Sequence, residues 1–165
     1  MKIFLIGLPG SGKSTIGKAL ANRLTMDFVD LDEEIESREG MIVPEIFAAQ
    51  GEDYFRRVEA ELLREWANAE RSFVMSTGGG TPCFFDGIRL INQYGISLFL
   101  DEQVDVIVER LENNQHRPLL RSDNVEDMRA KLERLREARL SIYQQASITV
   151  SSPTVSKVLS SLSLS

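Results

Sequence analysis

Residues 7–14 read Gly-Leu-Pro-Gly-Ser-Gly-Lys-Ser, between an apolar run at residues 3–6 and a helical pattern that begins at Ile16. Glycines allow the backbone to curl until several N–H groups point at one anion, and the following helix directs its positive end to the same place. Bulky side chains would block that approach. The stretch is a complete phosphate-binding loop in its strand-to-helix context, and it predicts that the chain binds ATP or GTP.

The polar residues of this loop have separate expected tasks. Lys13 is placed to reach between the β- and γ-phosphates, and the Ser14 hydroxyl is a hard oxygen ligand suited to magnesium. The residues that we expect to contact the nucleotide are Gly10, Ser11, Gly12, Lys13, Ser14 and Thr15. A glycine-rich turn that binds nothing is the alternative, and the completeness of the pattern disfavours it.

Composition limits the class of protein. The 165 residues suffice for one domain, and the net charge of −6 disfavours binding to nucleic acid or to an anionic membrane surface. The single cysteine and single histidine exclude an intramolecular disulfide and a zinc site made by this chain alone. No leader, membrane span or apolar heptad run is visible, so we expect a cytoplasmic monomer.

Short apolar runs alternate with longer helical patterns, which is typical of an α/β protein with a parallel sheet covered on both faces. The five expected strands lie at residues 3–6, 28–29, 73–75, 97–100 and 148–150. The expected helices lie at residues 14–24, 32–39, 44–50, 53–69, 87–94, 104–112, 125–144 and 155–162. Ligands gather outside the carboxyl ends of such strands, so the loops after the first three strands should face one crevice.

Two acidic residues, Asp30 and Asp32, follow the second expected strand. Alternation along an extended segment would point both carboxylates to one side of the chain. One could hold a magnesium-bound water, and the other could orient or deprotonate an acceptor hydroxyl. Alternatively, or in addition, Asp32 caps the helix that follows.

Three consecutive glycines, Gly78, Gly79 and Gly80, follow the third expected strand. Each glycine adds conformational entropy to the unfolded chain, so stability alone does not explain the triplet. We expect that something approaches the backbone closely at this point. A simple chain reversal is the alternative.

Several arginines are candidates to bind an anionic substrate. Arg56 and Glu59 lie three residues apart and share one helix face, where a guanidinium could clamp a carboxylate, although the pattern by itself favours a surface ion pair. Arg139 lies on a later helix, and periodicity does not distinguish it from its neighbours there. These neighbours are Arg129, Arg134 and Arg136.

Residues 113–124 form a polar stretch without periodicity between two helical patterns. Such a segment is typical of a mobile lid, which closes over a nucleotide, excludes water and carries an arginine to the γ-phosphate. Arg117 is the candidate for that arginine. An ordinary surface loop with solvated arginines is the alternative.

Together, and in this order, these motifs resemble those of shikimate kinase over nearly the whole chain. They are residues 7–14, Asp30-x-Asp32, Phe55-Arg56-x-x-Glu59, Gly78-Gly79-Gly80, Arg117-Pro118-Leu119-Leu120 and Arg139-x-x-x-Tyr143. Many unrelated proteins share the phosphate-binding loop, so the resemblance depends on the set. It implies transfer of the ATP γ-phosphate to the 3-hydroxyl of shikimate, with ATP and Mg²⁺ required, on the route to chorismate and the aromatic amino acids.

The resemblance also implies a fold. Residues 1–165 would form one domain with a three-layer P-loop fold like that of nucleoside monophosphate kinases. Its five-stranded parallel sheet would be flanked by helices, with a mobile lid at about 113–124 and a shikimate-binding helical region at about 32–60.

For the acceptor, the resemblance implies that Arg56 and Arg139 grip the shikimate carboxylate and that Glu59 holds Arg56 in place. Asp32 would contact the ring hydroxyls as the candidate base. The backbone of Gly78, Gly79 and Gly80 would line the pocket.

For the nucleotide, the resemblance implies that Asp30 acts on magnesium through water, beside Ser14. Lys13 and Arg117 would act on the transferring phosphate, and Arg110 and Pro153 would lie against the adenine. The polar residues 113–116 that precede Arg117 depart from the family pattern and could alter lid closure.

Other readings share part of this pattern. Gluconate kinases and nucleoside monophosphate kinases have the phosphate-binding loop and a lid, but the glycine triplet and the motif at residues 55–59 speak against them. A regulatory domain without turnover would be expected to have lost Lys13, Asp32, Arg56 or Arg139, and all four are present.

Overall fold

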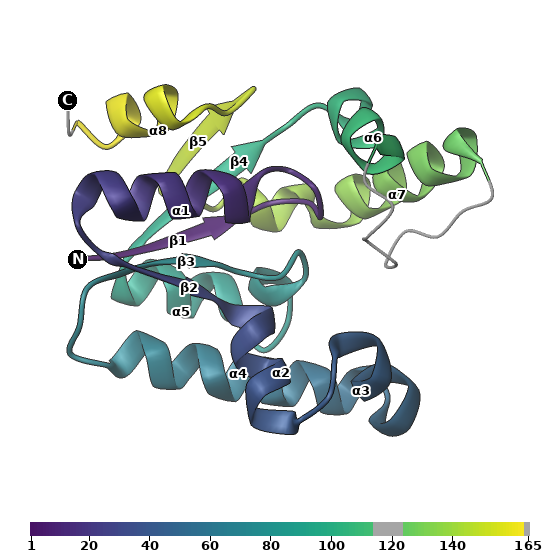
Figure 1. Ribbon diagram of the computed structural model, residues 1–165, viewed down its shortest axis with the longest axis horizontal. Helices are drawn as coiled ribbons and strands as arrows, with labels where there is room; N and C mark the ends of the chain where they lie inside the picture. The colour runs from purple at the N-terminus through teal and green to yellow at the C-terminus, as the bar shows by residue number, and fades with distance from the viewer. Residues whose placement is uncertain (114–123, 164–165) are drawn as a thin grey trace.

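A computed structural model of the chain describes residues 1–113 and 124–163 (Figure 1). It contains the five-stranded parallel sheet that the sequence predicts, and the structure adds the strand order, β2-β3-β1-β4-β5. The strands are β1 (Lys2–Ile6), β2 (Asp27–Asp30), β3 (Phe73–Ser76), β4 (Ile96–Asp101) and β5 (Ile148–Ser151).

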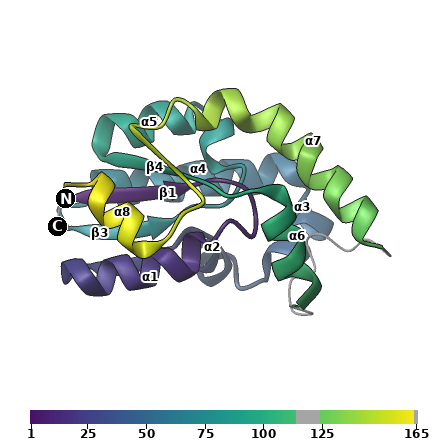
Figure 2. The ribbon, with the colours of Figure 1, turned by 90° about the horizontal axis from the view of Figure 1, so that it is seen from above.

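Helices cover both faces of this sheet. They are α1 (Lys13–Leu24), α2 (Leu31–Glu39), α3 (Val43–Gln50), α4 (Glu52–Asn68), α5 (Gly87–Tyr94), α6 (Val104–Asn113), α7 (Val125–Tyr143) and α8 (Val155–Ser161), with a 3₁₀ turn η1 (Thr81–Cys83). Seen from above, α1 lies on one side of the strands, and α5 and α7 lie on the other (Figure 2). The three-layer arrangement agrees with the predicted fold class.

The central strand β1 shows why the layers form. Its residues alternate between two core clusters, with Ile3 and Leu5 packed under α1 and α8, and Phe4 and Ile6 packed under α4, α5 and α7. All four side chains are completely buried. A strand buried on both faces reads as a continuous apolar run, which is the pattern of residues 3–6.

The predicted arrangement of the acidic pair is wrong in one respect. The chain leaves β2 at Asp30 and α2 begins at Leu31, so Asp32 lies in the first turn of the helix and not on an extended segment. Asp30, not Asp32, caps α2, because its Oδ1 accepts hydrogen bonds from the N–H groups of Asp32 and Glu33 at 3.0 and 3.3 Å.

Within residues 1–113 and 124–163, none of the helices has the length and apolarity that crossing a membrane requires.

The start of α5 packs closely against η1, and this contact generates a prediction about stability. A Cβ at Gly87 would lie 2.1 Å from the Thr81 carbonyl oxygen and 3.0 Å from Pro82 Cα, both backbone atoms. We expect Gly87→Ala to lower the free energy of unfolding by about 1–3 kcal/mol, although alanine is the better helix former by about 1 kcal/mol.

Denaturant unfolding monitored by circular dichroism measures the change. Arg89→Ala is the matched control, because Arg89 is exposed on the same helix and its replacement should change stability by less than about 0.5 kcal/mol. A Gly87→Ala variant as stable as the original chain would show that the backbone of η1 can shift to accommodate the added methyl group at little cost in free energy.

Candidate active site

The phosphate-binding loop lies between β1 and α1, and its backbone takes conformations that favour glycine. Gly10 and Gly12 have φ angles of 80° and 101°, and α1 begins at the next residue, Lys13. The N-cap residue of this helix is Gly12, which has no side chain to cap it, so the N–H groups of the first turn are directed at the loop. The buried Lys13 donates hydrogen bonds from Nζ to the carbonyl oxygens of Gly7 and Leu8, at 2.6 and 2.9 Å.

The carboxyl ends of β1, β2 and β3 bring three oxygen-bearing side chains together. Ser14 Oγ donates to Asp30 Oδ2 at 3.3 Å and lies 3.4 Å from Ser76 Oγ. Asp30 uses its other oxygen to cap α2, so one carboxylate fixes the helix and faces Ser14 at the same time. A hydroxyl beside a carboxylate is a donor set that fits Mg²⁺ or a water molecule bound to it.

Asp32 has an environment that suits a proton acceptor near neutral pH. The pKa of the Asp32 carboxyl is raised to about 6, chiefly by burial and in addition by the negative charges of Asp30 and Glu59, while Lys13 opposes the shift. A carboxyl with this pKa is ionised at neutral pH and still basic enough to take a proton.

Arg56 and Glu59 form a buried pair, so the surface ion-pair interpretation is wrong. Arg56 Nη1 donates to Glu59 Oε1 at 3.0 Å, and Glu59 Oε2 accepts from Thr81 Oγ1 at 2.8 Å. Glu59 is only 2% exposed, and its burial raises the pKa of its carboxyl, against the opposing charge of Arg56. The Phe84 ring lies 4.2 Å from the guanidinium carbon of Arg56, which adds a cation–π contact.

The glycine triplet lies against these arginines, as the sequence predicts for a backbone that something approaches closely. A Cβ at Gly79 would lie 2.9 Å from Arg139 Nη1, and one at Gly80 would lie 2.6 Å from Arg56 Nη1. A Cβ at Gly78 would lie 3.1 Å from Glu59 Oε2 and 3.2 Å from Asp32 Oδ1. Only glycines allow both arginines and both carboxylates to reach this loop.

The other arginines of α7 are placed differently. Arg136 pairs with Asp101 at 3.0 Å, Arg129 pairs with Asp105, and Arg134 is exposed. Arg139 is the arginine of this helix that faces the glycine triplet, which periodicity alone did not distinguish.

Two cavities open on these elements. The smaller, of about 180 Å³, is lined by Asp32, Arg56, Glu59, Gly78, Gly79, Gly80 and Arg139, together with Pro9, Val43, Phe47, Phe55 and Leu135. The larger, of about 690 Å³, is lined by Gly10, Gly12, Thr15, Ile16, Arg110, Leu111, Asn113, Pro153, Thr154 and Val155. The predicted acceptor residues therefore share one cavity, and several of the predicted nucleotide residues share the other.

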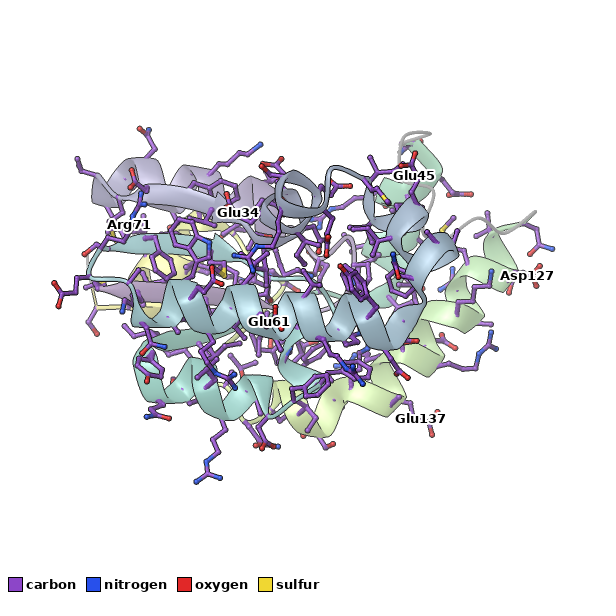
Figure 3. The ribbon with its side chains drawn as sticks, turned by 90° about the horizontal axis from the view of Figure 1, so that it is seen from below. Glu34, Glu45, Glu61, Arg71, Asp127 and Glu137 are labelled. Carbon is purple, nitrogen blue, oxygen red and sulfur yellow. The ribbon has the colours of Figure 1, made fainter. Side chains whose placement is uncertain are left out.

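The exterior carries many charged side chains. The acidic side chains of Glu45, Glu61, Asp127 and Glu137 lie on the outer surface of the helices (Figure 3). Arg56 and Arg139 line the smaller cavity, so a chain with a net charge of −6 can still offer a local site for an anion.

Sequence reasoning did not identify the supporting contacts of the triplet. The buried Tyr143 donates from its hydroxyl to the Gly79 carbonyl oxygen at 2.5 Å, and burial raises its pKa to about 12, so the donor stays protonated. Tyr143 lies four residues after Arg139, which places both on one helix face and was the available signal. Thr81 and Phe84 gave no comparable signal.

Arg117, with most of the predicted lid, lies outside the described residues.

Comparison with known proteins supports the motif analysis. The family model of shikimate kinase matches residues 9–162. The shikimate kinase of Parabacteroides distasonis is 42% identical over 149 residues, which cover 90% of this chain and 86% of that protein. The crystal structure of the Bacteroides thetaiotaomicron shikimate kinase has a TM-score of 0.93 and 35% identity, and covers 99% of both chains. An Acinetobacter baumannii shikimate kinase in complex with shikimate has a TM-score of 0.85 and 32% identity, covering 96% of this chain and 90% of that one.

The buried charge of Asp32 has a consequence for stability. Its folded pKa of about 6 exceeds the ordinary value of 3.8, so the folded chain binds the proton more tightly, and stability falls as pH rises between these values. We expect Asp32→Asn to raise the free energy of unfolding at about pH 7.5 by about 1–3 kcal/mol, and to have little effect near pH 4.

Urea unfolding at both pH values measures this difference. Glu61→Gln, at an exposed position on α4, controls for the loss of a carboxylate without desolvation. An Asp32→Asn variant that is less stable at pH 7.5 would contradict the desolvated-charge account.

Proposed function

The chain belongs to the shikimate kinase family, and we propose that the two cavities divide its reaction between acceptor and nucleotide. The chain is an ATP-dependent kinase that transfers the γ-phosphate of ATP to the 3-hydroxyl of shikimate, giving shikimate 3-phosphate and ADP. One observation above all supports our assignment of residues to this reaction. Two arginines converge on the glycine triplet beside Asp32, a carboxylate with a raised pKa.

Arg56 and Arg139 bind the carboxylate of shikimate. Both guanidinium groups approach the backbone of Gly79 and Gly80, and both line the smaller cavity. A planar guanidinium can donate two parallel hydrogen bonds to a carboxylate, and Glu59 and Phe84 hold Arg56 in one orientation for this purpose. The backbone of Gly78, Gly79 and Gly80 lines the pocket, because these residues have no side chains of their own to cover it.

Asp32 orients the 3-hydroxyl and accepts its proton as the phosphoryl group is transferred. The carboxylate lies in the same cavity as the two arginines, so a substrate held by its carboxylate presents ring hydroxyls to Asp32. Orientation of the hydroxyl and removal of its proton are tasks that phosphoryl transfer requires of the protein.

Lys13 and the phosphate-binding loop hold the phosphates of ATP. Lys13 leaves the carbonyl oxygens of Gly7 and Leu8 for the β- and γ-phosphates, a short movement because these carbonyls border the loop. When bound, Mg²⁺ neutralises charge that develops on the phosphates; Ser14 would hold it directly, and Asp30 through water. Thr15, Arg110 and Pro153 line the larger cavity, where the rest of the nucleotide would lie.

The remaining parts of the proposal concern organisation. Residues 1–165 act as one kinase domain, with a shikimate-binding region at about 32–60 and a lid at about 113–124. Arg117 of that lid, outside the described residues, steadies the transferring phosphate. We also propose a cytoplasmic monomer without nucleic-acid or membrane partners, in keeping with a biosynthetic enzyme and a net charge of −6.

A coupled assay of ADP release, with Mg²⁺ and ATP, tests the function. We expect turnover with shikimate and only background turnover with gluconate, AMP or no acceptor. AMP has no carboxylate for the two arginines, and gluconate is an open chain that does not hold its hydroxyls in the fixed positions of the shikimate ring. ATP binding without turnover on any of these acceptors would favour a regulatory domain.

The same assay tests the role of Asp32. We expect Asp32→Asn to lower kcat by about 10²–10⁴-fold while ADP binding stays nearly unchanged. In the original chain, we expect kcat/KM to decrease as the pH is lowered past about 6, where Asp32 becomes protonated. Comparable turnover in the variant would remove Asp32 as the base.

Arg139→Ala tests the carboxylate clamp separately. We expect it to weaken shikimate binding by about 2–4 kcal/mol, because one half of a buried clamp is lost, and to leave nucleotide affinity nearly unchanged. Arg134→Ala is the matched control, since Arg134 is exposed on the same helix. Isothermal titration with shikimate makes the comparison, and equal affinities in both variants would show that Arg139 does not bind the carboxylate of shikimate.

A further inference from the structure

Glu102 is a buried carboxylate that neither the motifs nor the reaction described above accounts for. It follows the last residue of β4, and its side chain is only 5% exposed. Its Oε1 accepts the N–H of Gln103 at 3.0 Å, and its Oε2 accepts Arg110 Nη2 at 3.0 Å. Buried carboxylates are costly without an opposite charge, so the pair constrains Arg110 as well as Glu102.

Arg110 uses a second arm of its guanidinium on the phosphate-binding loop. Its Nη1 donates to the Gly10 carbonyl oxygen at 3.3 Å, and a Cβ at Gly12 would lie 3.6 Å from the same nitrogen. The side chain is 47% exposed and lines the larger cavity. The guanidinium of Arg110 therefore joins a buried carboxylate at the end of β4 to the loop that would receive the phosphates.

The helix that carries Arg110 rests on the same glycine. A Cβ at Gly10 would lie 2.9 Å from Ile107 Cγ2 and 3.7 Å from Leu111 Cγ, both on α6. Gly10 is thus held by apolar contacts from α6 and by a hydrogen bond from Arg110. The position of the arginine depends on Glu102, because an exposed arginine without such an anchor samples many rotamers.

We propose that Glu102 is a positioning residue for the nucleotide: it holds Arg110 in the wall of the larger cavity and against Gly10. This inference rests on the nucleotide role proposed for that cavity. The ion pair compensates the charge of Arg110, so its contribution is a fixed planar surface beside the loop and not a free positive charge. A side chain ordered before binding loses less conformational entropy when the ligand arrives.

Titration calorimetry of the full chain with ADP, without acceptor, tests the proposal. Glu102→Gln keeps the shape of the side chain and removes its charge, and we expect it to raise the Kd for ADP by about threefold to tenfold. Glu65→Gln is the matched control, because it removes the carboxylate of the exposed Arg38–Glu65 pair and should leave the Kd unchanged. Shikimate affinity should be the same in all three proteins.

A double-mutant cycle separates positioning from a general structural effect. We expect Arg110→Ala to weaken ADP binding at least as much as Glu102→Gln, and the double variant to bind like Arg110→Ala alone. Arg110→Lys keeps the positive charge but loses the planar guanidinium, which donates to Glu102 and Gly10 at once, so it should also weaken ADP binding. This variant tests the proposal even if Glu102→Gln does not fold.

Four outcomes would overturn the inference. Unchanged or tighter ADP binding by Glu102→Gln would show that Arg110 needs no anchor, and additive effects in the double variant would show that Glu102 acts elsewhere. ADP binding by Arg110→Lys equal to that of the original chain would show that charge alone suffices. Failure of the original chain to bind ADP would instead overturn the nucleotide role of the cavity, and the inference with it.

Discussion

The buried ion pair between Arg56 and Glu59 is the interaction on which the acceptor site depends. It joins α4 to the glycine loop, because Glu59 also accepts a hydrogen bond from Thr81. Loss of one partner from such a pair leaves an uncompensated charge in the interior, which is costly. The guanidinium of Arg56 is therefore held in place before any substrate arrives. Its side chain loses conformational entropy when the chain folds and not when a ligand binds.

The glycine triplet is the second half of that constraint. It admits Arg56 from α4 and Arg139 from α7 to the same few backbone atoms, and Tyr143 fixes its Gly79 carbonyl oxygen. Two helices far apart in sequence thus meet at a loop that has no side chains of its own. A Cβ at Gly79 or Gly80 would displace an arginine, and one at Gly78 would press on Glu59 and Asp32. The triplet therefore keeps these charged groups in position, although glycines raise the conformational entropy of the unfolded chain.

The sequence predicted the sheet and its helices, because these depend on strong local signals: apolar runs and helical periodicity. It also singled out residues that the structure places around two cavities, chiefly through glycine spacing. It did not predict that Arg56 and Glu59 are buried, since an i,i+3 pair looks the same on a surface as beneath a loop. The arrangement at Asp30 and Asp32 was also mistaken, because helix α2 begins at Leu31, immediately after β2. The sequence also offers no reason to single out Glu102. A single acidic residue after a strand is common, and its pairing with Arg110, eight residues later, is visible only in the structure.

Two cationic side chains, Lys13 and Arg110, are bound to backbone carbonyl oxygens of the phosphate-binding loop in the absence of a nucleotide. Lys13 is bound to the carbonyl oxygens of Gly7 and Leu8, and Arg110 is bound to that of Gly10. The contacts of Lys13 and those of Arg110 would respond differently to ATP binding. In the proposed role, Lys13 would exchange its carbonyl partners for phosphate oxygens, whereas Arg110 is anchored by Glu102 and would remain where it lies. The loop would therefore combine a contact that breaks on binding with one that persists. Only the breaking of the Lys13 contact would oppose binding, and the Arg110 contact would hold the loop in place during the exchange.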